Sequence, residues 1–109
     1  MTKSVSVENG QSGLIAVDSE RGRQLGLTSD CFDPATYLWE EPERIMVSFV
    51  SSRKRGSFRA LVAAIHAEGK AVAVPTPLAR MGYIVRKNGY QHSTEDTEGG
   101  PCEIWTLKP

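Results

Sequence analysis

"RIMVSFVSSRKRGSFRALVAAIHAEGKAVAV" spans residues 44–74 and contains the pattern that decides the fold. Its first part, Ile45 to Val50, is almost wholly apolar, which predicts a central strand covered on both faces. The apolar residues that follow recur at the spacing of one helix face: Phe58, Leu61, Val62 and Ile65. Ala71 to Val74 then predicts a short buried strand. The stretch therefore predicts a β-α-β unit.

The residues around this unit predict where its helices begin and end. Ser57 is a candidate N-cap of the first helix, and Gly69 is a candidate residue just past its end. Thr76-Pro77 predicts the N-cap and first residue of a second helix, which Asn88-Gly89 ends. The apolar side of that helix is expected to consist of Leu78, Met81, Ile84 and Val85. A closing hairpin is expected from two runs, Tyr90–Thr94 and Glu103–Leu107.

The part of the chain before residue 44 is richer in turns. Strands are expected at Ser4–Glu8 and Gly13–Asp18, with one short helix around Arg21–Leu25. Tyr37–Glu40 and Arg44–Ser51 predict two neighbouring strands joined by a tight connection. We therefore predict an α/β domain, residues 1–109, with a mixed sheet and a central β-α-β-α-β segment.

Composition excludes several classes of protein. The 109 residues include 13 basic and 13 acidic side chains, so the net charge of zero does not favour general capture of nucleic acid. No apolar run reaches the ~18 residues that span a bilayer, and the N-terminus lacks a signal-peptide core. We expect a cytoplasmic protein without a membrane anchor.

The cysteines and histidines do not predict a metal site. Cys31 and Cys102 are far apart and form no Cys-x-x-Cys motif, which favours free, partly buried thiols. His66 and His92 have no metal-ligand spacing, and His66 is expected to be a partly exposed helix residue.

Charges are segregated along the chain. Residues 28–43 contain five carboxylates and no Lys or Arg, whereas residues 44–59 contain five basic residues and no acid. Such blocks can form two oppositely charged rims or simply solvated faces, and both interpretations stay open.

The basic loop RKRGSF, residues 53–58, joins a buried strand to a helix N-terminus. Backbone N–H groups at a helix start have no helical partners, and the helix dipole favours an anion there. Gly56 allows close approach of the backbone, and the three preceding cations can contact phosphate oxygens. The loop therefore predicts a diphosphate site.

Two segments carry a resemblance to a known family. Arg53–Val62, Arg-x-x-Gly-x-Phe-x-x-Leu-Val, resembles the acyl-CoA pyrophosphate loop of the GNAT-type N-acetyltransferase superfamily. Met81–Tyr90 is similar to that family's closing segment, Ala-x-x-Leu-Tyr-x-Lys-x-Gly-Phe. The resemblance implies a GNAT-like domain in which residues 44–107 form the acyl-CoA-binding portion and residues 1–43 a short acceptor-side portion.

The resemblance also implies a function and its residues. Acetyl-CoA would be the co-substrate, and an amine of unknown identity would attack its thioester directly. The loop residues implied to bind the cofactor are Arg53, Lys54, Arg55, Gly56, Ser57 and Phe58. The backbone N–H groups implied to polarise the carbonyl are those of Phe49, Val50 and Ser51. Glu40 or Glu41 would act as the base, and Tyr83 is the nearest phenol for the acid.

Three residues depart from the family pattern. Phe58 replaces a small loop residue, Leu78 replaces an asparagine that often contacts the cofactor, and Val85 replaces a tyrosine that commonly protonates the leaving thiolate. Two alternatives therefore stay open. One is a degenerate GNAT fold that binds CoA or a protein partner without turnover. The other, less favoured, is a nucleic-acid-binding module that uses the basic loop and Arg59 together with Arg80, Arg86 and Lys87. A homodimer is also open.

An acceptor site is expected on the acidic segment. Glu40 and Glu41 follow Tyr37-Leu38-Trp39, so one of the two carboxylates is expected to point toward the cleft. Trp39 or Tyr37 would form an apolar wall for the ammonium group.

Overall fold

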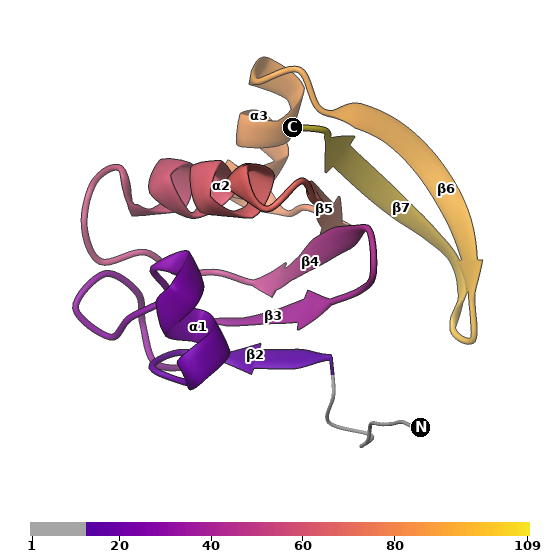
Figure 1. Cartoon of the computed structure of the whole chain (residues 1–109). Coiled ribbons are helices and arrows are strands. Elements are labelled where there is room, and N and C mark those ends of the chain that lie inside the picture. Colours follow the sequence, from indigo (N-terminus) through magenta and orange to yellow (C-terminus); the bar gives the residue numbers. More distant parts are fainter. Residues whose placement is uncertain (1–12) are drawn as a thin grey trace, which may run out of the picture.

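Over residues 13–109 the fold is α/β, with a six-stranded mixed sheet and three helices (Figure 1). The structure, a computed structural model, describes residues 13–109, so the predicted strand Ser4–Glu8 lies outside the described residues. The sheet order is β2-β3-β4-β5-β7-β6. The strands are β2 (Leu14–Ala16), β3 (Tyr37–Glu40), β4 (Arg44–Phe49), β5 (Ala71–Pro75), β6 (Gln91–Thr97) and β7 (Gly100–Leu107), and the helices are α1 (Glu20–Leu25), α2 (Ser57–Ala67) and α3 (Ala79–Lys87).

The predicted β-α-β unit is confirmed as β4-α2-β5. β4 and β5 are the parallel pair of the sheet, and they pair from Arg44 opposite Ala71 to Met46 opposite Ala73. The other strand pairs of the described sheet are antiparallel. The pairing between these two strands ends at Met46 and Ala73, although β4 itself continues to Phe49. A gap between two strand ends therefore opens on the side from which α2 starts.

Both predicted helices form, but their starts differ from the prediction. Gly56, not Ser57, is the N-cap of α2, with a φ of 85°, and Ser57 is the buried first residue of the helix. α3 begins at Ala79 with Leu78 as its N-cap rather than Thr76. Thr76 has a φ of 41°, in the left-handed region, whereas a capping threonine has extended backbone angles. Its N–H donates to the Glu103 carbonyl at 2.7 Å, so Thr76 continues the bonding of β5 to β7.

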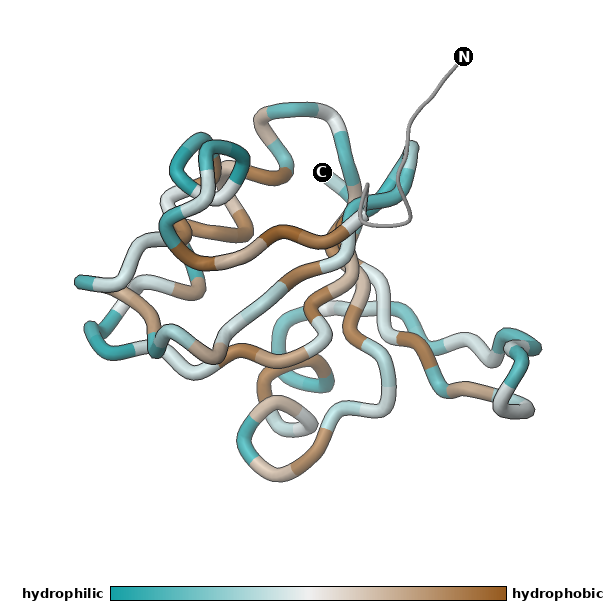
Figure 2. Tube along the Cα trace, turned by 90° about the horizontal axis from the view of Figure 1, so that it is seen from below, coloured by the Kyte–Doolittle hydropathy of each residue, from teal (hydrophilic) through white to brown (hydrophobic). Residues whose placement is uncertain are grey.

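The core lies between one face of the sheet and the helices. The buried strand residues of this face are Ile15, Leu38, Ile45, Val47, Val72 and Val74, and the helix residues packed with them are Leu25, Leu61, Ile65 and Val85. Figure 2 shows hydrophobic residues gathered along the strands and hydrophilic ones at the loops and the hairpin end. These strand residues share one face because every second side chain of a strand points to the same side of the sheet.

Within residues 13–109, no helix covers the opposite face of β2, β3 and β4, so the prediction that both faces of β4 are covered is wrong. Four large apolar side chains remain exposed there, by 39–50%: Leu14, Tyr37, Trp39 and Phe49. A bulge shifts the register so that Phe49 lies opposite Tyr37 while Val47 lies opposite Leu38. The extra residue, Ser48, turns Phe49 to the same side as Tyr37 and Trp39. These four residues, with Met46, are called the open face below.

The closing hairpin is longer than predicted. β6 and β7 pair from Gln91 opposite Thr106 to Thr97 opposite Gly100, so both strands reach the Glu98-Gly99 turn. Figure 1 shows this hairpin extending away from the rest of the sheet. It is held to β4 by an ion pair between Arg44 Nη1 and Glu95 Oε2 at 2.7 Å. Both cysteines are unpaired and half-buried, as expected.

Candidate functional site: a basic groove between two helices

A groove of about 700 Å³ lies between α2 and α3. Five of its lining residues are cationic, and none is acidic. The cations are Arg53, Lys54, Arg55, Arg59 and Arg80. The apolar part of the lining comes from Phe58, Val62, Ile84, Tyr90 and Leu107. The arrangement combines a strongly positive mouth with an apolar floor, which suits a ligand that has both anionic and apolar parts.

The loop that supplies most of this charge is anchored from one side. The Arg53 backbone N–H donates to the Cys31 carbonyl at 2.7 Å, and the Arg53 guanidinium donates to the Ser29 carbonyl at 3.0 Å. Phe32 and Ser52 form an isolated antiparallel bridge beside these bonds. The segment before β3 therefore fixes the start of the loop. Lys54 is 3.5 Å from Asp30, and both side chains are well exposed, so this pair leaves the cation available.

Both helices begin at the groove without a capping side chain. Neither the N-cap of α2 nor that of α3 makes a side-chain cap hydrogen bond, and neither first turn contains an acid. Each first turn carries an arginine instead, Arg59 in α2 and Arg80 in α3. A cation at the positive N-terminal end of a helix is unfavourable by ~0.3–1 kcal/mol, whereas an anion bound there interacts favourably with the helix dipole. The local electrostatics therefore favour an anion.

Most of the predicted cofactor residues line this groove. Arg53, Lys54, Arg55, Gly56 and Phe58 are all among its lining residues. Ser57 is not, because its side chain is buried as the first residue of α2.

The three predicted backbone donors do not lie together at the groove. Phe49 is exposed on the open face, and Val50 packs against the core. The Ser51 N–H donates to Thr36 Oγ1 at 3.1 Å, so this N–H already has a partner.

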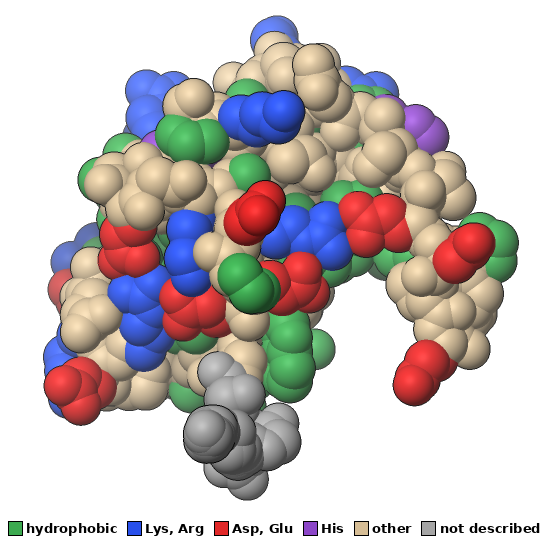
Figure 3. All heavy atoms as spheres, turned by 45° about the vertical axis from the view of Figure 1, so that its right-hand side comes forward, with side chains coloured by type: hydrophobic (Ala, Val, Ile, Leu, Met, Phe, Trp, Pro, Cys, Tyr) green, Lys and Arg blue, Asp and Glu red, His purple; other side chains and the backbone are tan. Residues whose placement is uncertain are grey.

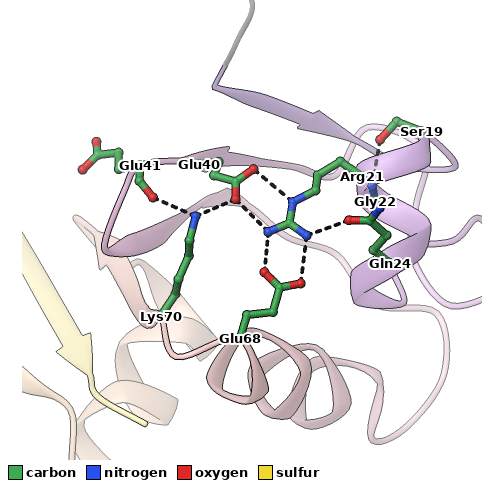
Figure 4. A network of polar contacts seen from close by, with 8 residues as sticks. All are labelled: Ser19, Arg21, Gly22, Gln24, Glu40, Glu41, Glu68 and Lys70. Atoms are coloured by element: carbon green, nitrogen blue, oxygen red, sulfur yellow. Dashed lines mark hydrogen bonds and ion pairs between the residues drawn. The ribbon is translucent and has the colours of Figure 1, made fainter.

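Glu40 and Glu41 belong to a different part of the molecule (Figure 4). The Glu40 carboxylate accepts two hydrogen bonds from Arg21, at 3.0 and 2.7 Å, and one from Lys70 at 2.6 Å. These donors, Arg21 first, hold the pKa of Glu40 below its ordinary value. Glu41 accepts from Arg44 Nε at 2.7 Å. Both carboxylates are thus held in ion pairs.

The network lies at the far end of β4 from the basic loop. Glu40 is opposite Ile45 at the start of β4, whereas the loop begins after Ser51. Six strand residues separate these points by roughly 20 Å. The structure does not bring the two predicted bases to the groove.

The remaining predicted residues on α3 do not face the groove either. Tyr83 is 59% exposed, and its hydroxyl accepts a hydrogen bond from Lys87 at 2.9 Å. Leu78 is 75% exposed, so it is not part of the apolar side predicted for this helix. Val85 is fully buried in the core.

The α3 side of the groove was not predicted as part of the cofactor site, although Arg80 was grouped with the basic loop in the nucleic-acid alternative. Arg80, Ile84 and Asn88 line it, and their spacing of four residues places them on one helix face. The sequence shows this spacing, but it does not indicate that this face of α3 lies opposite α2. Tyr90 also lines the groove, and burial raises the pKa of its phenol to about 12.

No family model, curated protein or solved structure matches this chain. Among residues 13–109, no helix is long and apolar enough to cross a membrane. The same residues contain no cluster of His, Cys, Asp and Glu able to hold a metal ion.

Proposed function

We propose that the chain binds an acyl-CoA thioester in the basic groove and acts as an acetyl-CoA-dependent N-acetyltransferase on an amine. The observation that carries this proposal is a groove with five cations and no acid at the uncapped starts of two helices. A diphosphate supplies the anion that both helix starts favour. Each arginine can donate two parallel hydrogen bonds to phosphate oxygens. The apolar floor provides contact area for the rest of the cofactor.

The thioester end of the cofactor is proposed to lie where the pairing of β4 and β5 ends. Beyond Met46 and Ala73 these strands no longer pair with each other, so backbone groups along their facing edges are available to the amides of an extended ligand chain. The start of α2 and the N-terminal segment of α3 follow these same strand ends. A cofactor with its diphosphate in the groove would therefore direct its acyl end into the gap.

The proposed reaction is a direct acyl transfer. The amine nitrogen forms a bond to the thioester carbonyl carbon, and the carbon–sulfur bond breaks. The thiolate leaves with the electron pair and takes a proton, while the amine nitrogen loses one to water. Within residues 13–109, the carboxylates predicted as bases are ion-paired away from the groove, so water is the proton acceptor in this proposal.

A second candidate is a CoA-binding domain without turnover. It is favoured by the lining of the groove, whose described residues include one phenol, Tyr90, and no carboxylate. Burial keeps that phenol protonated, with a pKa of about 12, and only 7% of the residue is exposed. No exposed acid or base of the described groove is therefore placed to move a proton.

Thermal melting with ligands tests the binding part of the proposal. Acetyl-CoA and CoA, each at ~100-fold excess over its dissociation constant, should add ~2.7 kcal/mol and raise the melting temperature by roughly ten degrees. Arg59→Gln and Arg80→Gln should each reduce this shift. Arg86→Gln is the matched control, because Arg86 lies on α3 outside the groove and is exposed. A shift with a single-stranded oligonucleotide, but with neither CoA compound, would favour the nucleic-acid alternative.

Turnover separates the two candidates. Release of free CoA thiol from acetyl-CoA is followed with a thiol reagent over a panel of amines and basic peptides. Amine-dependent release that Arg59→Gln weakens supports the transferase. A clear melting shift without release on any acceptor supports the CoA-binding domain.

A further inference from the structure

Tyr90 is a buried phenol in the floor of the basic groove. Asn88 and Gly89 end α3, with Gly89 at a φ of 81°, and the Tyr90 N–H donates to the Val85 carbonyl at 3.3 Å. This turn carries Tyr90 into the core, where only 7% of the residue stays exposed. Because Tyr90 is a lining residue of the groove, its remaining surface opens into the groove.

The hydroxyl of Tyr90 has no hydrogen-bond partner among residues 13–109. Burial alone raises the pKa of this phenol to about 12, and no hydrogen bond or neighbouring charge contributes. The hydroxyl is therefore a donor at neutral pH. Leaving a buried hydroxyl without a partner is unfavourable, and native structures contain few such groups. A polar group of a ligand bound in the groove can supply the missing partner.

Two other lining residues suit a flat, polar ring. Phe58 is half-buried against the core, and its ring offers a surface on which a heterocycle can stack. The Asn88 side-chain Nδ2 donates to the Ile84 carbonyl at 2.8 Å, whereas none of the described residues donates to its Oδ1. This part of the groove therefore combines an aromatic surface, one hydroxyl donor and one amide acceptor.

The cations of the groove remain available to a ligand. Within the described part of the chain, Lys54 is the only one of the five that forms an ion pair, with Asp30 at 3.5 Å. On the face shown in Figure 3, by contrast, Lys and Arg side chains lie beside Asp and Glu side chains over much of the body. Four cations without an acidic partner match the charge of a ligand with two or more phosphates.

We propose that the groove binds an adenine nucleotide with two or more phosphates, in which the Tyr90 hydroxyl donates to N1 of the base and Asn88 Oδ1 accepts from its 6-amino group. This edge of adenine carries one acceptor and one donor group, which match the phenol and the amide oxygen. The same edge of guanine carries two donor groups, so one of them exceeds this pair. A lipid phosphate has no polar group in its apolar part to meet Tyr90.

Adenine binding also bears on the proposed cofactor. That the base is the adenine of CoA rests on the proposed function. Binding of an adenine nucleotide does not, because ADP has the base and the diphosphate but no pantetheine arm and no thioester. Since both ligands occupy the same groove, ADP should compete with acetyl-CoA and inhibit acyl transfer.

Isothermal titration calorimetry with ADP, UDP and inorganic pyrophosphate tests the proposal without CoA. ADP should bind about tenfold more tightly than pyrophosphate, which has the phosphates but no base. Tyr90→Phe removes only the hydroxyl, so it should weaken ADP binding about fivefold and leave pyrophosphate within twofold. Tyr83→Phe is the matched control, because that phenol is exposed and lies outside the groove. It should leave both affinities within twofold.

A change in the ligand tests the assigned hydrogen bond. 1-Deaza-ADP has a C–H group in place of N1 and should bind the parent about fivefold more weakly than ADP. Tyr90→Phe should weaken this analogue no further, because the bond is already lost. Without ligand, Tyr90→Phe should melt no lower than the parent, since the hydroxyl that it removes has no partner there.

Several results would overturn the proposal. They are pyrophosphate or UDP binding as tightly as ADP, independent effects of Tyr90→Phe and the deaza change, and a melting temperature of Tyr90→Phe lower by about five degrees or more. A CoA-induced melting shift together with equal affinities for ADP and pyrophosphate would reject this proposal alone. ADP binding that depends on Tyr90, without a shift by either CoA compound, would support it and reject the proposed function.

Discussion

Arg21 and Glu40 form a two-point ion pair in which Nε donates to Oε1 at 3.0 Å and Nη2 donates to Oε2 at 2.7 Å. The pair joins α1 to β3. Arg21 also pairs with Glu68, the C-cap residue of α2, and Lys70 completes the network on Glu40 (Figure 4). Side chains from three parts of the fold thus meet at one half-buried guanidinium, about 27% exposed.

A double-mutant cycle on Arg21 and Glu40 should give a coupling energy of about 1 kcal/mol. Exposed ion pairs contribute ~0.2–1 kcal/mol, and the fork geometry places this pair at the upper end of that range. Arg21→Met, Glu40→Gln and the double variant are compared by urea unfolding. Arg86→Met serves as the control for loss of an exposed arginine. A coupling energy near zero would mean that the Arg21–Glu40 pair makes no net contribution to the free energy of unfolding.

The same network predicts acid sensitivity. Arg21 lowers the pKa of Glu40 and Glu68, and Arg44 lowers the pKa of Glu95, each from an ordinary value of 4.5. Their folded pKa values lie below the unfolded ones, so this stabilisation is complete above pH 4.5 and is lost as pH falls through the folded values. The free energy of unfolding should therefore decrease below about pH 4.5. In Arg21→Met the decrease should be smaller, and an unchanged pH profile would contradict this.

Tyr90 predicts a loss of stability at high pH. Burial raises its pKa from 10.0 to about 12, so the folded chain favours the protonated phenol. That contribution is complete below pH 10 and is lost as pH rises through 12. Tyr90→Phe removes the group that titrates and should make urea unfolding less dependent on pH between 10 and 12. Tyr83→Phe, at an exposed position, is the control and should match the parent.

Gly56 offers a paired test of the anion site. Its φ of 85° lies in the left-handed region, and a Cβ there meets no atom within 4 Å. Gly56→Asn and Gly56→Asp should each cost about 1 kcal/mol through the backbone alone, since both residue types tolerate this region better than most. Only Asp adds a negative charge at the groove. The CoA-induced melting shift should survive better in Gly56→Asn, and equal shifts would count against a diphosphate at this loop.

Val85→Tyr should destabilise the chain and should not create activity. The side chain of Val85 is fully buried in the core, so a phenol there must displace its neighbours. Overpacking of this kind costs about 1–3 kcal/mol. The melting temperature reports the cost, and the thiol-release assay reports turnover. A variant that melts like the parent, or that gains turnover, would show that residue 85 reaches the cofactor instead.

Much of the fold was readable from local sequence. The apolar run 45–50, the helical spacing after Ser57 and the Ala-Val run at 71–74 predicted β4, α2 and β5, and the structure confirms all three. These elements follow from periodicity, which acts over a few residues. The basic loop was equally visible, because its cations and its glycine are adjacent in the chain. Five of its six residues line the groove as expected.

The sequence could not reveal which face of the sheet the helices cover. α1, α2 and α3 contribute Leu25, Ile65 and Val85 to one core, so the opposite face of β4 stays open. The start of α3 also differed from the local prediction, because Thr76 is bonded to Glu103 across the sheet and has a left-handed φ of 41°.

Only the tertiary structure decided the partners of the charged side chains. In the sequence Glu40 and Glu41 were an acidic pair beside two aromatic residues, but Arg21 and Lys70 bind Glu40, and Arg44 binds Glu41. In the sheet, β5 and β7 lie between the strands of Arg44 and Glu95, so only the path of the hairpin in space brings Glu95, about fifty residues later, to Arg44. Charge attraction acts through space, so its partners depend on sheet order and register, whereas strand and helix formation depend on neighbours along the chain.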